Sequence, residues 1–183
     1  MRLLLLAAPG GGKGTQGDRL AAFYDIDHIS SGDVLRAAAQ ADTPLGREVA
    51  AYQRRGDLVS DEIVFDLLIP VMAAAAAHGG YILDGFPRTL TQAVRAFDVA
   101  KQNDFTLEAV VYLNVPDPVL IERMRGRARP DDTDEVIKHR LDVFTETTRP
   151  LIAYYQERGI LVEIDGNQAP DDITAEIKAR LPS

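Results

Sequence analysis

The sequence contains no cysteine, carries little positive charge and has no apolar segment of membrane-spanning length. The absence of cysteine excludes a disulfide framework and a zinc site with thiolate ligands, so we expect no zinc. A net charge of −8 argues against nucleic acid or an anionic membrane as a partner. The apolar run at residues 71–77 is far too short to cross a bilayer. We therefore expect a soluble, cytoplasmic protein.

The first eight residues faintly resemble a signal peptide, because Arg2 precedes a short apolar run. Glycines and Lys13 follow where a cleavage site would lie, so we interpret the run as part of the fold. With 183 residues, 46% of them apolar, the chain can bury one sizeable core. Lysine is scarce: 4 Lys accompany 16 Arg, a bias that suits bidentate recognition of phosphate groups.

A glycine-rich loop at residues 9–14 directly follows the apolar run at residues 3–8. The run predicts a buried strand of a parallel sheet, and a helix is expected to begin near Gly14. Glycines let successive backbone N–H groups turn inward, and the helix N-terminus adds partial positive charge. With Lys13 as a mobile counter-charge, the loop predicts a polyphosphate site.

The match to the P-loop pattern G-x-x-x-x-G-K-[ST] is imperfect at two positions. Ala7 stands where the pattern has glycine, and Gly14 follows Lys13, which displaces the usual metal-binding hydroxyl to Thr15. The alternative is a glycine-rich turn that contains a lysine by coincidence. The expected strand before the loop and helix after it favour phosphate binding.

Short apolar segments alternate with helical patterns along the chain, which is typical of an α/β fold with a parallel sheet. Ser31 is expected to cap a helix inside a small helical insertion, and Pro150 is expected to bend or restart a later helix. Distinctive residues follow the predicted strand ends, where ligands bind in open α/β sheets. The predicted strands span residues 3–8, 27–30, 81–84, 109–113 and 160–165.

An acidic residue, Asp84, ends the strand predicted at residues 81–84. An acid at the tip of such a strand, together with a P-loop, can order Mg²⁺ around nucleotide phosphates. The alternative is an Asp that initiates a turn before Gly85. The turn at residues 85–88 presents Arg88 at the same edge of the sheet. His28 is a lone strand histidine, and we assign it no role.

Five ordered motifs resemble the adenylate kinase family, in particular its bacterial short-lid form, along essentially the whole chain. They are PGGGKGTQ at 9–16, ISSGDVLR at 29–36, GDLVSDE at 56–62, LDGFPRT at 83–89 with Gln92, and GRAR at 126–129 with DDT at 131–133. The resemblance implies a P-loop nucleoside monophosphate kinase fold with a five-stranded parallel sheet flanked by helices. It also implies a monomer of nucleotide biosynthesis that transfers a phosphoryl group reversibly from MgATP to AMP, giving two ADP.

The resemblance further implies a division of the chain and a role for individual residues. The core would comprise residues 1–29, 60–125 and 133–183, with an AMP-binding insertion at 30–59 and a short lid at 126–132. Mg²⁺ would be held through water by Asp84. The residues expected to bind ATP are Gly10, Gly11, Gly12, Lys13, Gly14, Thr15, Arg123, Arg127 and Gly166. Those expected to bind AMP are Ser31, Arg36, Asp57, Leu58, Val59, Gly85, Arg88, Gln92, Arg129 and Arg140. The expected catalytic residues are Lys13, Arg88, Arg123, Arg129 and Arg140.

Three alternative functions stay open on the residues alone, and the arginine run has an alternative of its own. A pyrimidine nucleoside monophosphate kinase would share the fold, but Ser31 and Gln92 favour adenine, because an amide can pair with adenine's donor–acceptor edge. A small GTPase would need a guanine-binding N-K-x-D run, which the sequence lacks. The chain could also be a non-catalytic nucleotide-binding module. The run of arginines at 123, 125, 127 and 129 could be no more than a solvated face. Lys13, Asp84, Arg88 and Arg127 together favour an enzyme.

Overall fold

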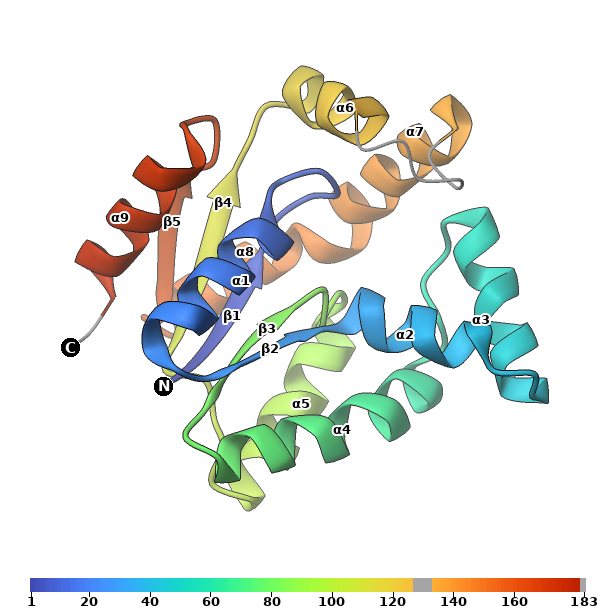
Figure 1. The fold of residues 1–183 in the computed structure, drawn as a ribbon, viewed down its shortest axis with the longest axis horizontal. Helices are drawn as coiled ribbons and strands as arrows, with labels where there is room; N and C mark the ends of the chain where they lie inside the picture. The colour runs from blue at the N-terminus through green and yellow to red at the C-terminus, as the bar shows by residue number, and fades with distance from the viewer. Residues whose placement is uncertain (127–132, 182–183) are drawn as a thin grey trace.

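Five parallel strands form the centre of the structure, as the predicted fold class requires. The computed structural model describes residues 1–126 and 133–181 of the chain. The strands pair in the order β2-β3-β1-β4-β5 (Figure 1). They are β1 (Arg2–Leu6), β2 (Asp27–Ser30), β3 (Tyr81–Asp84), β4 (Ala109–Asn114) and β5 (Leu161–Asp165).

The register of the sheet brings three chain segments to one edge. Asp84 pairs with Leu5 of β1 on one side and with Ser30 of β2 on the other. The glycine-rich loop, the start of the insertion and the turn at residues 85–88 therefore leave the sheet at the same level. Because the strands are parallel, their carboxyl ends open onto one common crevice.

Helices cover both faces of the sheet (Figure 1). On one face, α1 (Lys13–Tyr24) and α9 (Pro170–Arg180) pack on a cluster that includes Leu3 and Leu5. On the other, α4 (Asp61–Ala77), α5 (Leu90–Gln102) and α8 (Pro150–Glu157) enclose a larger cluster with Leu4 and Leu6. Both faces of β1 are thus buried, which explains its unbroken apolar sequence.

The predicted helical insertion consists of α2 (Ser31–Gln40) and α3 (Pro44–Arg55), which project beyond the carboxyl edge of the sheet (Figure 1). The expectation that Ser31 caps α2 is wrong. Ser30 is the capping residue, with its hydroxyl 3.4 Å from the Asp33 backbone N–H, and Ser31 is already the first helical residue. The shift by one position turns the Ser31 side chain inward, where it is 1% exposed.

Other helix limits follow the predicted signals more closely. The helix α1 begins at Lys13, one residue before the expected Gly14. α6 (Asp117–Gly126) and α7 (Asp134–Val143) flank the segment expected to be a lid, and residues 127–132 of that segment lie outside the described residues. Before Pro150 the chain widens into a π-helical segment, Phe144–Thr148, and α8 starts at the proline itself, which confirms a restart there.

We predict that replacing Leu68 with alanine lowers the free energy of unfolding by about 2–5 kcal/mol. Leu68 is 0% exposed in the larger cluster, so its truncation removes buried contacts and leaves a cavity. Val71→Ala, on the same helix at 39% exposure, is the matched control and should change stability by about 0.5 kcal/mol or less. Urea denaturation of both variants tests this, and equal losses would contradict the packing described.

Candidate active site

The glycine-rich loop adopts a conformation that only glycine tolerates well at two positions. Gly10 and Gly12 have φ angles of 83° and 89°, in the left-handed region. A Cβ added at Gly11 would lie only 2.6 Å from the Cβ of Ala7. The methyl group of Ala7 thus occupies the space that Gly11 leaves open, and the departure from the P-loop pattern is accommodated inside the loop.

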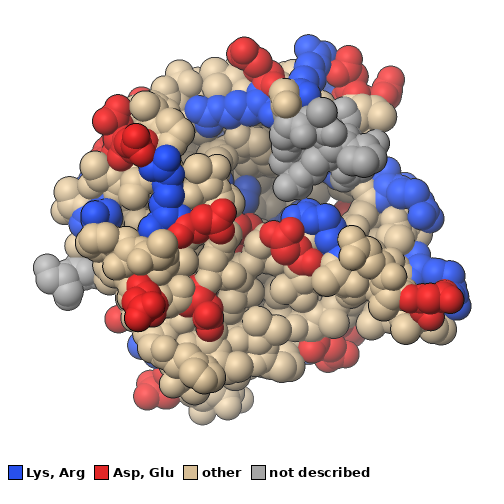
Figure 2. All heavy atoms as spheres, in the orientation of Figure 1, with Lys and Arg blue, Asp and Glu red and all other residues tan. Residues whose placement is uncertain are grey.

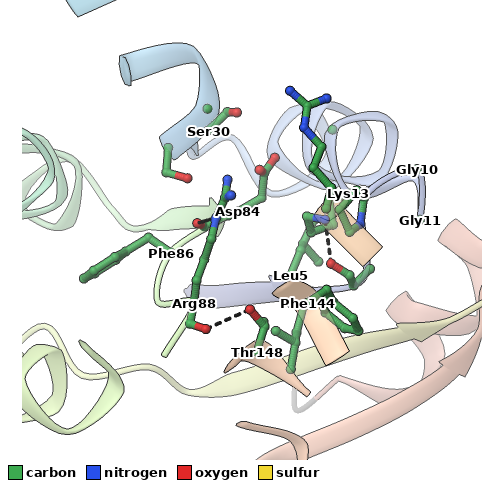
Figure 3. A pocket seen from close by; sticks show the side chains of 18 of the residues that line it. Leu5, Gly10, Gly11, Lys13, Ser30, Asp84, Phe86, Arg88, Phe144 and Thr148 are labelled. Carbon is green, nitrogen blue, oxygen red and sulfur yellow. Dashed lines mark hydrogen bonds between the residues drawn. The ribbon is translucent and has the colours of Figure 1, made fainter. Parts of the chain in front are cut away.

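Lys13 lies at the start of α1 and reaches back over the loop (Figure 3). Its ammonium group donates to the carbonyl oxygens of Ala7, at 2.7 Å, and Ala8, at 3.2 Å. The loop, the lysine and the N-terminus of α1 therefore concentrate positive potential at one point of an acidic protein.

A cavity of about 1020 Å³ opens at the carboxyl edge of the sheet. Figure 2 shows the hollow near the centre of this face, with basic side chains in and around it. The glycine-rich loop, α2, the segment 57–59 and the turn 85–88 all line the cavity. The predicted site residues that line it are Gly10, Gly11, Gly12, Lys13, Gly14, Thr15, Ser31, Arg36, Asp57, Leu58, Val59, Gly85, Arg88, Gln92, Arg123 and Arg140, together with Asp84.

Arg88 is held in the cavity by two backbone contacts. Its Nε donates to the carbonyl oxygen of Gly85 at 2.6 Å, and its own carbonyl oxygen accepts from the Thr148 hydroxyl at 2.7 Å (Figure 3). Burial lowers the pKa of Arg88, Asp84 opposes that shift, and the neighbouring positive charges of Arg140 and Arg36 lower it further. Because arginine keeps its charge in proteins, the gathered guanidinium groups favour a bound anion.

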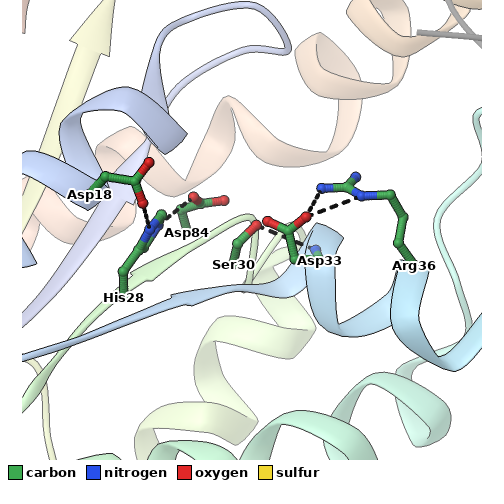
Figure 4. Close-up of polar contacts among 6 residues, drawn as sticks. All are labelled: Asp18, His28, Ser30, Asp33, Arg36 and Asp84. Atoms are coloured by element: carbon green, nitrogen blue, oxygen red, sulfur yellow. Dashed lines mark hydrogen bonds and ion pairs between the residues drawn. The ribbon is translucent and has the colours of Figure 1, made fainter.

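Asp84, which lines the cavity, is one of three polar side chains linked by hydrogen bonds (Figure 4). The Nε2 atom of His28 lies 2.9 Å from Asp84 Oδ2, and its Nδ1 atom lies 2.8 Å from Asp18 Oδ1. The pKa of His28 is raised, chiefly by the hydrogen bond to Asp84; burial opposes the shift and Asp18 adds to it. The histidine that sequence patterns leave without a role thus orients the carboxylate at the tip of β3.

Two further polar side chains that line the cavity, Ser31 and Gln92, are buried. Among the described residues, the Ser31 hydroxyl is buried without a hydrogen-bond partner, which points to a partner that a ligand would supply. Gln92 is 3% exposed, and both ends of its amide are engaged. Its Oε1 accepts from the Arg88 backbone N–H at 2.8 Å, and its Nε2 donates to Asp61 at 2.7 Å.

The remaining predicted residues are less central. Gly166 does not line the cavity; its carbonyl oxygen accepts from Arg123 at 3.1 Å, and a Cβ there would meet Val115 at 2.5 Å. Arg127 and Arg129 lie outside the described residues. Sequence patterns missed His28, Asp18, Asp61 and Thr148. For His28, its place on a predicted strand next to the one that ends at Asp84 was the available signal.

Comparison with known proteins gives a consistent result over the whole chain. The family model for adenylate kinase matches residues 5–160. The chain is 46% identical to an adenylate kinase of Prochlorococcus marinus strain MIT 9303 over 180 residues, covering 98% of each chain. It is 44% identical to adenylate kinase 1 of Nostoc sp. strain PCC 7120, covering 100% of this chain and 99% of that one. An adenylate kinase of Xanthomonas euvesicatoria is 43% identical, covering 99% of each.

We predict that Gly17→Ala destabilises the protein, because a Cβ there would overlap the imidazole of His28 and displace it from Asp84. The expected loss is about 1–3 kcal/mol in the free energy of unfolding. Gly14→Ala, three residues earlier on α1, is the control, since an added Cβ there meets nothing within 4 Å. It should leave stability unchanged or raise it by up to about 1 kcal/mol. Thermal or urea unfolding of the nucleotide-free variants measures both effects, and a Gly17→Ala protein as stable as wild type would contradict the packing at His28.

Proposed function

The chain belongs to the adenylate kinase family, and we propose how the residues that line the cavity at the carboxyl edge of the sheet carry out phosphoryl transfer between MgATP and AMP. The observation that carries the proposal is the pairing of two anion-binding features across one cavity. The P-loop lines this cavity, and so do Arg36, Arg88 and Arg140, whose guanidinium groups lie near one another. A nucleoside triphosphate would bind at the P-loop and a nucleoside monophosphate at the arginines, with their phosphates facing each other.

The donor nucleotide would bind on the side of the glycine-rich loop. The backbone N–H groups of residues 10–15 and the N-terminus of α1 would hold the ATP phosphates, and Lys13 would exchange its contacts with loop carbonyls for phosphate oxygens. Arg123 lies on α6 beside the same side of the cavity. Arg123 and Gly166 are the other described residues that we propose for ATP binding. Arg127 is proposed on the resemblance alone.

The acceptor nucleotide would bind between the insertion and the turn 85–88. Arg36, Arg88 and Arg140 would bind the AMP phosphate, with Arg129 added on the resemblance alone. Ser31, Gln92, Gly85 and the segment 57–59 would enclose the nucleoside. The unpartnered Ser31 hydroxyl supports this assignment, since a buried hydroxyl without a partner is costly unless a ligand satisfies it.

The proposed reaction requires alignment and charge stabilisation rather than a general base. An oxygen of the AMP phosphate, already ionised at neutral pH, forms the new bond to the γ-phosphorus of ATP. The bond from that phosphorus to the β,γ-bridging oxygen breaks, and ADP leaves with the electron pair. Lys13, Arg88, Arg123 and Arg140 surround the cavity in which this charge moves, so they would stabilise it throughout the transfer.

The residues present fit a Mg²⁺ ion that is held mainly by the substrate. No group of three or more His, Asp or Glu side chains that could hold a metal occurs within residues 1–126 and 133–181. Asp84 lines the cavity, and its Oδ2 is occupied by His28. Mg²⁺ keeps several waters and binds few carboxylates in kinase sites. Asp84 would therefore hold the ion through water, and the ion would neutralise charge on the phosphates.

Closure of the insertion around AMP and of the lid around ATP is proposed to bring donor and acceptor together and to exclude water. Water would otherwise compete with AMP as the acceptor. We propose residues 30–59 as the moving AMP-binding part and residues 126–132 as the lid, between core segments 1–29, 60–125 and 133–183. The described residues include no helix long and apolar enough to cross a membrane. A monomeric state and a cytoplasmic location are proposed on the resemblance to the family.

We predict that Arg88→Ala lowers kcat at least tens-fold, and by as much as about 10²–10³-fold, because it removes a charge that stabilises the transferring group. A coupled assay of ADP formation from ATP and AMP measures the effect. Arg47→Ala is the control, since Arg47 is exposed on α3 and pairs with Asp42 away from the cavity. Near-normal turnover of the Arg88→Ala enzyme would remove Arg88 from the proposed machinery.

Substrate choice provides the direct test of the proposed function. We expect kcat/KM to be higher for AMP than for UMP or CMP, because Ser31 and Gln92 offer a hydroxyl and an amide to the base. Omitting Mg²⁺ and adding EDTA should abolish most of the activity, since the phosphates would lose their counter-ion. A preference for UMP would favour a pyrimidine nucleotide kinase on the same fold.

A further inference from the structure

The side-chain amide of Gln92 is fixed at both of its ends. The Arg88 backbone N–H, which can only donate, lies 2.8 Å from Oε1. The carboxylate of Asp61, whose oxygens accept, lies 2.7 Å from Nε2. These two partners leave one choice for the orientation of the amide, with its oxygen towards Arg88 and its nitrogen towards Asp61.

The amide is held by rigid parts of the fold. Asp61 is the first residue of α4, and Gln92 lies in the first turn of α5, where its backbone N–H donates to the Thr89 hydroxyl at 3.1 Å. Gln92 is 3% exposed, so water has little access to the amide. A turned amide would place its oxygen against the carboxylate and its NH₂ group against the Arg88 N–H, which leaves buried groups unsatisfied.

A fixed amide distinguishes bases by their hydrogen-bonding edge. After its two protein contacts, the amide oxygen keeps one lone pair and the nitrogen keeps one N–H. This acceptor–donor pair matches adenine, whose N6 amino group donates and whose N1 accepts. Hypoxanthine presents the reverse, since its O6 accepts and its N1–H donates. The same fixed amide can therefore satisfy adenine and must oppose a 6-oxopurine.

We propose that Asp61 is a positioning residue that determines specificity, because its carboxylate fixes the orientation of the Gln92 amide. In that orientation the amide accepts AMP and rejects the monophosphates of 6-oxopurine nucleosides. The proposal rests on the proposed function, in which Gln92 faces the base of AMP. Asp61 does not line the cavity, so it acts through Gln92 rather than on the nucleotide. Sites built from buried hydrogen-bonding groups discriminate strongly, because the wrong ligand leaves those groups unpaired.

The test compares kcat/KM for AMP and IMP, which share their phosphate and ribose and differ in the base edge presented to the amide. Asp61→Asn keeps the shape of the side chain but adds a donor that can meet a turned amide oxygen. We expect the AMP-to-IMP ratio to fall about tenfold, with kcat/KM for IMP rising. The Arg88 N–H still opposes the turned amide, which limits the gain. Asp61→Ser, which also adds a donor, serves as the second variant if Asp61→Asn folds poorly.

Two controls separate the lock from a structural effect. Glu62→Gln removes the same charge from the exposed neighbouring position and should leave the ratio at its wild-type value. In a Gln92→Ala background, Asp61→Asn should no longer change the ratio, because the residue through which it acts is gone. Thermal unfolding of each variant confirms that it is folded.

The outcomes are distinguishable. A fall in the ratio that disappears in the Gln92→Ala background supports the lock. An unchanged ratio, equal losses with both nucleotides, or the same fall without Gln92 would overturn it while the proposed function stands. Failure of the wild-type enzyme to phosphorylate AMP would instead overturn the proposed function itself.

Discussion

The structure depends on concentrating positive charge at one edge of the sheet in a protein whose net charge is −8. Like charges repel, so side chains such as Arg88, Arg140 and Arg36 need fixed partners to share one cavity. Arg88 is held by the Gly85 carbonyl, and Arg36 pairs with Asp33. The cost of assembling these charges is offset when a phosphate binds. The positive charges are then already in place before the substrate arrives. Such preorganised charge is the main requirement of phosphoryl transfer.

The sheet register converts local sequence signals into this site. Because Asp84 pairs with both Leu5 and Ser30, three turns that are far apart in sequence start at one level. The apolar runs, the glycines and the alternation of strands and helices sufficed to predict the fold class and this edge. They could not predict side-chain partners across strands, so the contacts of His28 with Asp84 and Asp18 became visible only in three dimensions.

Two local features show where sequence signals were insufficient. Either Ser30 or Ser31 could cap α2 by composition, and the choice depends on where β2 ends. The end of β2 at Ser30 leaves Ser31 to turn its hydroxyl towards the cavity side, which a one-residue shift would prevent. Likewise, Ala7 looks like a defect in the P-loop pattern, but its methyl fits the space beside Gly11. Neither point follows from residue type, because both depend on atomic packing.

An exposed ion pair joins the segment after α3 to α7, in addition to the apolar packing of Leu35 and Val49 against the core. His139 of α7 lies 2.9 Å from Asp57, which also pairs with Arg55 at 2.7 Å. Hydrogen bonds from these two residues lower the pKa of Asp57, and the bond from Arg55 has the larger effect. The carboxylate therefore stays ionised to lower pH than a free aspartate, and the ion pair persists. All three side chains are at least 36% exposed, and exposed ion pairs stabilise little. Gly56 lies beside Arg140, since a Cβ added at Gly56 would be 3.3 Å from Arg140 Cγ. In the proposed function Arg140 belongs to the acceptor side, so the proposed insertion lies beside an acceptor residue. The exposed ion pair with His139 would oppose closure only weakly.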